Sequence, residues 1–425
     1  MRPRNLQNLR PCLSASNFIA RYTKKVMDLN DILKIAVKAS ASDIHMKAGL
    51  SPTFRIDGAL VPLNNAPRMS PEEITKIANE IMTPQQKLKF QEFNEIDLAY
   101  GVPGLGRFRV NVFQQRGTMG MVLRVIPTKI QTIKELMLPP VLEKISMTER
   151  GLILVTGATG SGKSTTLAAM VDYINETSAT HIVTIEEPIE YLIKDKKSIV
   201  NQREVGVDTM GFNLALRAAL RQDPDVILVG EMRDAETIET AISAAETGHI
   251  VFSTLHTLDA AETINRIVSV FPPYQQKQIR LQLGSILRAV VSQRLVPRKD
   301  EQGRVAAVEI LINTARIREL IEDPERTKEI PTAIQEGFTS FGMQSFDQSL
   351  MQLLKQDIIT MEEALRQASN PDDFSLRVSG ISATSDTNWD AFELIPGADQ
   401  AQEANKKNSA TITTPKKSPA SAAGK

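Results

Sequence analysis

Hydrophobic residues follow two different patterns along the chain, and the change falls near residue 140. Before it, short runs rich in β-branched and aromatic residues predict strands. These runs are Ser42–Met46, Thr53–Ile56, Ala59–Leu63, Ile96–Tyr100, Gly106–Gln115 and Met119–Ile126. After it, apolar runs alternate with helical periodicity, which is the pattern of a parallel sheet covered by helices. We therefore expect an α/β protein with two domains.

The first domain is expected over residues 27–126 as a small α+β unit. A helix is predicted from Asp28, because apolar residues recur on one helical face: Leu29, Ile32, Leu33, Ala36 and Val37. Asp57-Gly58 between two strand-like runs predicts a hairpin. Ser70-Pro71-Glu72-Glu73 reads as a capping box with proline at the first helical position.

The remaining boundaries follow from composition. Residues 127–140 contain three prolines and little periodicity, which predicts a linker. Residues 141–370 are expected to form the second domain, with helices and strands alternating to about Ile312 and helices after it. Residues 371–425 are expected to be mostly disordered, because few large apolar side chains follow residue 395. Trp389, Phe392 and Leu394 precede that stretch and form either a docking motif or a patch packed on the chain's own surface.

Residues 1–26 form an N-terminal extension with six basic residues, no acidic residue and no apolar core of signal-peptide length. The extension is a basic arm, a targeting peptide or the result of an upstream start codon. The last reading or a disordered arm is favoured, because Met27 opens the first periodic segment.

Charge and cysteine content exclude several classes. The formal net charge is zero, so nothing global indicates binding to nucleic acid or to an anionic membrane. Cys12 is the single cysteine, which excludes an internal disulfide framework and a cysteine-rich zinc site and suits a reducing cytoplasm. No apolar run reaches membrane-spanning length, so membrane association is expected only through partners or surface contacts.

One loop has the spacing G-x-x-x-x-G-K-S of a P-loop. Its residues are Gly157, Ala158, Thr159, Gly160, Ser161, Gly162, Lys163 and Ser164, followed by Thr165. An apolar strand precedes the loop and a helix follows it, so its backbone N–H groups are expected to surround phosphate oxygens. Lys163 would reach the β- and γ-phosphates of ATP, and the Ser164 hydroxyl would bind Mg²⁺.

Two acidic clusters follow apolar strands, at Thr184–Glu190 and at Pro224–Asp234. Strand C-termini are the ligand-binding edge of an open α/β sheet. Hydrolysis needs one carboxylate to orient water and another to help hold Mg²⁺. Carboxylates in both clusters are therefore candidates for these roles.

Two of the four histidines flank a third apolar strand, within Thr247–Thr257. A metal site there would need a cysteine or a third histidine, and none is close in sequence. A single histidine is more often a hydrogen-bonded structural residue. We expect a polar sensor of the γ-phosphate at the strand end.

The segment Arg107–Arg116 alternates basic and apolar side chains, so one face of the strand should present Arg107 and Arg109. Such cations are candidates for arginines that act on a neighbouring subunit, and an ordinary charged sheet face is the alternative.

Together these motifs resemble the PilT/PilU group of type IV pilus retraction ATPases, within the secretion ATPase superfamily. The resemblance covers about residues 27–381 and rests on the P-loop and on three segments in a fixed order: Thr184–Glu190, Gly230–Asp234 and Thr247–Thr257. It implies a PAS-like N-terminal domain, a RecA-like P-loop ATPase domain, and a homo-hexameric ring in the cytoplasm. The ring would be peripheral at the inner membrane through the pilus machinery, and its expected partners are an inner-membrane pilus platform protein and a paralogous retraction ATPase.

The resemblance also implies roles for individual residues. Glu190 would be the catalytic base, Glu231 would assist Mg²⁺ and water, and His256 would sense phosphate. Arg109 and Arg124 would be the arginines that act in trans.

The sequence departs from the family pattern in several places. Glu186-Glu187-Pro188 replaces the usual Glu-Asp-Pro, and Ala158 replaces a common proline. Extension ATPases of the superfamily carry a four-cysteine zinc motif, which a chain with one cysteine lacks, so retraction is favoured over extension. The retraction motif is altered at Ala315–Glu322, while Gly342–Leu350 and the long C-terminus resemble PilU.

Three functions therefore remain. The leading hypothesis is a ring ATPase that powers pilus retraction and twitching motility. The second is an accessory PilU-like ATPase that acts through a PilT paralogue. The third is a nucleic-acid translocase on the same core, which the zero net charge and the single tryptophan disfavour.

Overall fold

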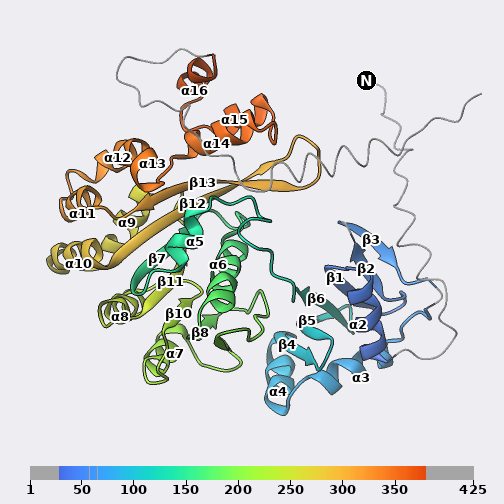
Figure 1. Ribbon diagram of the computed structural model, residues 1–425. Helices are drawn as coiled ribbons and strands as arrows, with labels where there is room; N and C mark the ends of the chain where they lie inside the picture. Colours follow the sequence, from blue (N-terminus) through green and yellow to red (C-terminus); the bar gives the residue numbers. More distant parts are fainter. Residues whose placement is uncertain (1–27, 57, 65, 380–425) are drawn as a thin grey trace, which may run out of the picture. The chain divides into compact units, whose positions relative to one another are not determined.

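The computed structural model describes residues 28–56, 58–64 and 66–379 (Figure 1). These residues form two compact units. The first runs to Lys129 and includes residues 190–192, and the second comprises residues 130–189 and the chain from Ile193. The predictions for residues 1–26 and for Trp389, Phe392 and Leu394 concern positions outside the described residues. None of the described helices is long and apolar enough to cross a bilayer.

The first unit is built on an antiparallel sheet of six strands in the order β3-β2-β1-β6-β5-β4. The strands are β1 (Asp43–Lys47), β2 (Thr53–Ile56), β3 (Ala59–Pro62), β4 (Glu95–Val102), β5 (Gly106–Gln115) and β6 (Thr118–Ile126). Every strand predicted in this part of the chain is present, and β2 and β3 pair antiparallel with Ile56 opposite Ala59, as the predicted hairpin requires. The likeness to a PAS domain stays a prediction.

Three helices accompany this sheet: α2 (Leu29–Lys38), α3 (Pro71–Ile81) and α4 (Pro84–Phe93). The predicted capping box at Ser70 is formed. The Ser70 hydroxyl accepts a hydrogen bond from Glu73 N–H, and the Glu73 carboxylate accepts one from Ser70 N–H. Thr83 caps α4 in the same way. Buried side chains of α2 and α3, such as Leu33 and Ile74, join those of the strands in one core.

The second unit is built on a seven-stranded sheet in the order β13-β12-β7-β11-β10-β8-β9 (Figure 1). The strands are β7 (Gly151–Thr156), β8 (His181–Glu186), β9 (Ile199–Glu204), β10 (Val226–Val229), β11 (Ile250–Leu255), β12 (Leu287–Pro297) and β13 (Arg304–Ile312). Strands β12, β7, β11, β10, β8 and β9 pair in parallel, as the alternation predicted. The expectation of a parallel sheet is wrong for the last strand, because β12 and β13 form an antiparallel pair.

Helices cover both faces of the second sheet, because alternate residues of its buried strands face opposite ways. The α-helices between the linker and Glu336 are α5 (Val141–Ser146), α6 (Lys163–Thr177), α7 (Phe212–Ala219), α8 (Ala235–Glu246), α9 (Ala260–Ser269), α10 (Pro273–Ile286), α11 (Ala315–Glu322) and α12 (Ile330–Glu336). Leu152 and Leu154 of β7 pack with residues of α7 to α12. Ile153 and Val155 pack with residues of α5 and α6.

Four described helices follow α12, and the last three of them contribute side chains to the core on the β12–β13 pair. They are α13 (Phe338–Phe341), α14 (Phe346–Lys355), α15 (Met361–Gln367) and α16 (Pro371–Val378). The predicted boundary at residue 370 is placed too early, because α16 continues the fold and buries Phe374 beside Leu350 and Val296. The expectation of disorder from residue 380 onward lies outside the described residues.

The predicted linker 127–140 crosses the division between the two units, which falls after Lys129. Its later part has no regular periodicity, yet Ile133 and Leu138 are buried in the core of the second unit. Apolar anchors in an irregular segment carry no periodic signal, which is why composition alone did not reveal them.

Candidate functional site

The loop between β7 and α6 has a shape that only glycine permits. Gly157, Gly160 and Gly162 have φ angles of 141°, 78° and 93°, where other residues are strained. A Cβ atom added at Gly157 would lie 2.4 Å from the carbonyl oxygen of Gln293. One added at Gly162 would lie 2.8 Å from Nε2 of Gln293. The three predicted glycines therefore form the tight curl of a P-loop.

Polar atoms converge inside this curl. Lys163 is the first residue of α6 and is buried, and its Nζ donates to the carbonyl oxygens of Gly157 (2.8 Å) and Ala158 (3.1 Å). The Ser161 hydroxyl is buried and has no hydrogen-bond partner among the described residues. The N-terminus of the fifteen-residue helix α6 adds its dipole at the same place. This cradle fits a phosphate group, which would supply acceptors for these donors.

The two predicted Mg²⁺ ligands, Ser164 and Glu231, come from different elements of the second unit. Ser164 is half-buried in the first turn of α6, next to Thr165, and Glu231 follows β10. The described part of the chain holds no cluster of three or more histidine, cysteine or acidic residues that could bind a metal by itself. Mg²⁺ in nucleotide sites is held by one or two protein ligands together with phosphates and water, and this donor set fits that arrangement.

Parallel strands β7, β11, β10 and β8 are neighbours, so their carboxyl ends share one edge of the sheet. The P-loop follows β7, Glu231 follows β10, and His256 follows β11. Hydrogen bonds from Ser253 to Val229 O (2.8 Å) and from Thr254 to Gly230 O (2.6 Å) hold the ends of β11 and β10 together. Both strands are buried, which makes this edge a firm support.

Glu231 is brought together with a guanidinium group and an imidazole ring. Its Oε1 lies 2.5 Å from Nη2 of Arg233, and its Oε2 lies 3.6 Å from Nε2 of His256. The Glu231 side chain is only 13 % exposed, whereas that of Arg233 is 71 % exposed. Two side chains that the sequence marked separately, a carboxylate and a histidine at strand ends, therefore lie together. Sequence reasoning did not single out Arg233, although it stands two residues from Glu231.

The two histidines of the third cluster have different surroundings. His249 Nδ1 lies 2.9 Å from the carbonyl oxygen of Ala244 at the end of α8, a structural contact. His256 is half-exposed and faces Glu231. Of the two, His256 follows β11 at the same sheet edge as the P-loop, and its role as a phosphate sensor stays a prediction.

The three glutamates of Thr184–Glu190 differ in their hydrogen bonds and in their exposure. Oε1 of Glu186 accepts from Thr184 Oγ1 (2.6 Å) and from Gln202 Nε2 (3.0 Å), so it is held at the sheet. Glu187 and Glu190 are exposed. Glu190 groups with the first unit, as do Leu192 and Pro127, whose backbone groups are hydrogen-bonded at 3.3 Å. The role of Glu190 as a base stays a prediction.

The two predicted arginines stand side by side in the first unit. Arg109 of β5 and Arg124 of β6 are directly opposed across the strand pair, and the register continues through Asp43 of β1 to Arg55 of β2. Arg124 Nε donates to Asp43 Oδ1 at 2.9 Å, and Arg55 lies 3.9 Å from the same carboxylate. Four neighbouring strands thus present a charged row of three arginines and one aspartate.

Asp43 organises this row. Burial opposes its ionisation, but hydrogen bonds from Ser42 and Arg124 outweigh burial and hold its pKa below the usual range. The Arg124 side chain remains 68 % exposed and that of Arg109 44 % exposed. Both guanidinium groups are therefore accessible for a further partner.

Gln293 of β12 is a site residue that the sequence did not reveal. It is 3 % exposed, its Oε1 accepts from Thr166 Oγ1 of α6 at 2.9 Å, and its backbone and amide lie against Gly157 and Gly162. Its neighbour Ser292 accepts from Thr156 Oγ1 at 3.0 Å. β12 therefore packs behind the P-loop although the contacting residues are 127 and 136 positions apart in sequence. No local motif indicates such a contact.

Glu309 of β13 supports the segment that follows His256, as Gln293 supports the P-loop. Its Oε1 accepts from Ala260 N–H (2.8 Å), where α9 begins four residues after His256. Burial raises the pKa of Glu309 to about 7, although the Ala260 hydrogen bond opposes the rise. Ser292 and Glu309 are opposed in the β12–β13 register, so one strand pair supports both loops of the site.

The comparisons with known proteins agree with this geometry. Residues 22–366 match the family model described as Type II/IV secretion system protein. The chain is 49 % identical to the type IV pilus retraction ATPase PilT of Pseudomonas aeruginosa over 348 residues, which are 82 % of this chain and 100 % of that protein. It is 43 % identical to the type IV pilus ATPase PilU of the same organism, over 83 % of this chain and 91 % of that one.

Two solved structures have the same architecture. A crystal structure of the pilus retraction motor PilT with bound ADP matches with a TM-score of 0.74 and 50 % identity, covering 81 % of this chain and 98 % of that one. The Legionella pneumophila ATPase DotB matches with a TM-score of 0.68 and 31 % identity, covering 85 % and 98 %.

Fold and site thus define a P-loop nucleotide-binding protein with a mixed α/β architecture. The chain belongs to the Type II/IV secretion system protein family and is a PilT- and PilU-like ATPase of that family.

Proposed function

We propose that this chain is a cytoplasmic motor that forms a homo-hexameric ring and uses ATP hydrolysis to retract type IV pili. The observation that carries the proposal is the P-loop with Glu231 and His256 beside it, in a chain that matches the whole length of the P. aeruginosa retraction ATPase. The ring would act at the inner membrane through a pilus platform protein.

In this mechanism the residues of the second unit bind and orient ATP. The P-loop N–H groups hold the phosphates, and Lys163 turns from its carbonyl partners toward the β- and γ-phosphates. Bound Mg²⁺, next to Ser164 and Glu231, would neutralise charge that develops on the phosphates. Glu190 accepts the proton of the attacking water, and His256, paired with Glu231, responds to loss of the γ-phosphate.

The first unit supplies the remaining positive charge. Arg109 and Arg124 are adjacent and accessible, and we propose that they reach the nucleotide of a neighbouring subunit. An arginine supplied in trans typically contributes about 10³–10⁵ in rate. Each active site would then be complete only in the ring.

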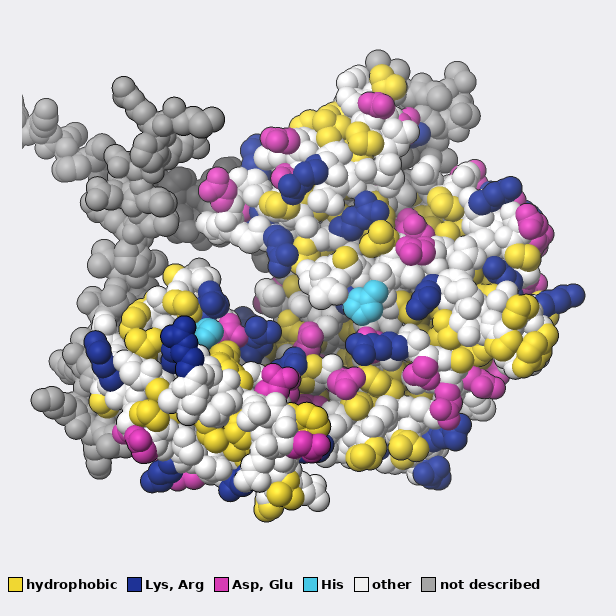
Figure 2. All heavy atoms as spheres, turned by 180° about the vertical axis from the view of Figure 1, so that it is seen from behind, with side chains coloured by type: hydrophobic (Ala, Val, Ile, Leu, Met, Phe, Trp, Pro, Cys, Tyr) yellow, Lys and Arg dark blue, Asp and Glu magenta, His cyan; other side chains and the backbone are white. Residues whose placement is uncertain are grey.

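An accessory role beside a paralogous retraction ATPase is the second candidate, supported by 43 % identity to PilU. A translocase is disfavoured by the zero net charge and the single tryptophan, and Figure 2 shows basic and acidic side chains intermixed on the face it presents.

Imaging labelled pili in cells that lack the gene tests the proposal. A main motor predicts that retraction stops, and that the wild-type chain restores it while Lys163→Ala does not. An accessory ATPase predicts retraction that continues with reduced force or frequency. Normal retraction in the deleted strain would contradict both, and ATPase activity stimulated by single-stranded DNA would favour a translocase.

A further inference from the structure

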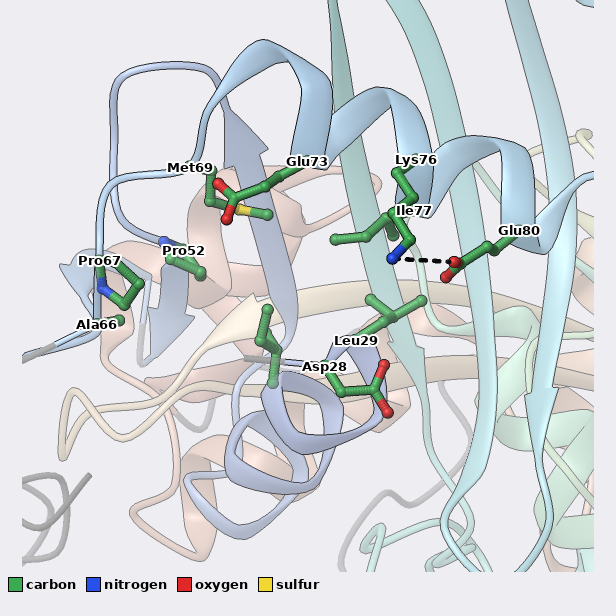
Figure 3. Close-up of a pocket in the computed structure, with 11 residues that line it drawn as sticks. Asp28, Leu29, Pro52, Ala66, Pro67, Met69, Glu73, Lys76, Ile77 and Glu80 are labelled. Atoms are coloured by element: carbon green, nitrogen blue, oxygen red, sulfur yellow. Dashed lines mark ion pairs between the residues drawn. The ribbon is translucent and has the colours of Figure 1, made fainter. Parts of the chain in front are cut away.

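The first unit contains a pocket of about 250 Å³ that the proposed motor cycle does not use. It lies between the start of α2, the helix α3 and the chain between them (Figure 3). Leu29, Ile32, Met69 and Ile77 line it and are buried, which gives it an apolar floor. Small-molecule sites usually measure about 300–1,000 Å³, so this pocket suits one or two anchoring side chains better than a whole ligand.

The charged residues of the lining are mostly acidic. Asp28, Glu73 and Glu80 face a single basic residue, Lys76, which leaves a net charge of −2 at the lining. Figure 3 shows Lys76 and Glu80 of α3 pointing toward the side where Asp28 lies, and the Lys76–Glu80 pair measures 3.9 Å. This excess of negative charge disfavours phosphates, nucleotides and other anions as occupants.

Asp28 itself adds an independent observation. It occupies the N-cap position of α2, where an aspartate normally accepts a hydrogen bond from a backbone N–H of the first turn. Here its side chain makes no capping hydrogen bond. Glu73, by contrast, is committed to Ser70 N–H at 2.7 Å. The carboxylate of Asp28 is therefore the acceptor that a cationic occupant can use first, and Glu80, whose ion pair with Lys76 is exposed and long at 3.9 Å, is the second.

A segment of matching chemistry is attached next to the pocket. Residues 1–26 contain six basic residues and no acidic one, and they join the described chain beside Asp28. Within them Phe18-Ile19 is an apolar pair followed closely by three cations: Arg21, Lys24 and Lys25. The eight residues between Ile19 and Asp28 span up to about 28 Å when extended, which is ample reach for a neighbouring pocket.

We propose that residues 1–26 dock on their own domain, with Phe18-Ile19 in this pocket and the following cations against Asp28 and Glu80. The tether keeps the segment at a high effective concentration, so two modest contributions suffice: burial of an apolar anchor and weak exposed ion pairs. The proposal concerns the first unit alone and does not depend on the function proposed for the second.

The single cysteine makes the test direct, because Cys12 lies in the segment and is the one thiol of the chain. A benzophenone maleimide attached to Cys12 of the full-length chain can be photolysed and its cross-links mapped by mass spectrometry. The expected cross-links fall mainly on the lining of the pocket, in residues 28–32, 52–69 and 73–80.

Charge-removing variants distinguish docking from random encounter. Each exposed ion pair is expected to contribute about two- to fivefold, so Asp28→Asn with Glu80→Gln should lower the yield at the pocket about fivefold or more. Glu92→Gln is the matched control, because Glu92 is an exposed carboxylate of α4 that does not line the pocket. Phe18→Ser should lower the yield with the pocket itself unchanged.

Three results would overturn the proposal. The first is a cross-link pattern spread evenly over the surface or missing altogether. The second is a pocket yield that the double variant lowers no more than Glu92→Gln does. The third is cross-links formed mainly between an isotope-labelled and an unlabelled chain, which would assign the pocket to the segment of a second copy.

Discussion

The two sheets of this chain carry their chemistry in different places. In the second unit β7, β10 and β11 are buried along their whole length, so functional side chains stand where the strands end. In the first unit β5 alternates between buried and accessible residues, so an entire face can present charge. The first arrangement builds a firm cradle for one ligand, and the second builds a row of arginines able to meet another surface.

The largest expected effect comes from the P-loop. Lys163→Ala should lower ATP turnover about 10³-fold or more, because no other cation of the loop can replace its charge at the γ-phosphate. Steady-state phosphate release measures this, with Lys144→Ala on the exposed side of α5 as the control. A folded Lys163→Ala chain that keeps its turnover would place the phosphates elsewhere.

Glu190→Gln should rank next, with turnover reduced about 10²- to 10³-fold and ATP binding retained, because an amide keeps the shape but accepts no proton. Equilibrium binding of a fluorescent ATP analogue and single-turnover hydrolysis separate the two effects. Glu187→Gln is the control from the same loop. If Glu187→Gln shows the loss instead, the base is Glu187.

A smaller effect is expected where the second sheet supports the loop. Gln293→Ala removes the acceptor of Thr166 and the side-chain amide behind Gly162, while the carbonyl oxygen behind Gly157 stays, so KM for ATP should rise about tenfold while kcat changes less. Gln302→Ala, an exposed position between β12 and β13, is the matched control. Equal effects of the two substitutions would show that Gln293 does not position the P-loop.

Glu309 should affect stability far more than turnover. Its pKa is raised in the folded chain from 4.5 to about 7 by burial, so the folded state favours the protonated form. The resulting stability is present below about pH 4.5 and is lost as the pH rises through about 7, on the order of 3 kcal/mol in total. Asp259, Arg294 and Asp347 are the charged groups that act on it.

Glu309→Gln keeps an acceptor for Ala260 N–H and removes this titration. The difference in unfolding free energy between variant and wild type should therefore grow in favour of the variant from pH 5 to pH 8. Urea unfolding at several pH values measures it. A difference that does not change with pH would mean that Glu309 is ionised in the folded chain throughout this range.

Sequence reasoning succeeded where a feature is local. The P-loop, the strands before Glu231 and His256, and the capping box at Ser70 all follow from spacing within ten residues. It failed where the evidence is distant in sequence. Gln293 and Glu309 act through contacts with α6 and α9, and an isolated glutamine or glutamate on an apolar strand looks like any other polar residue.

Boundaries failed for a related reason. The tail was expected to begin at residue 371, yet Phe374 of the short helix α16 is buried against the β12–β13 pair. One apolar anchor is too little to show periodicity. The alternating pattern of residues 107–116 predicted that Arg109 is presented on one face of its strand. The continuation of the charged row to Arg124, Asp43 and Arg55 depends on strand register.

The most direct test of the account asks whether the arginine face of one subunit completes the phosphate site of another. Arg109→Ala with Arg124→Ala in one chain, and Glu190→Gln in another, should each leave little ATP turnover. In a ring with heterologous interfaces, an equal mixture joins intact arginines to an intact base at roughly a quarter of the interfaces. Turnover of the mixture should therefore rise well above that of either variant, whereas Arg116→Ala, an exposed control in the turn between β5 and β6, should remain active alone. A mixture no more active than its two components, or turnover per chain that does not depend on protein concentration, would contradict the shared site.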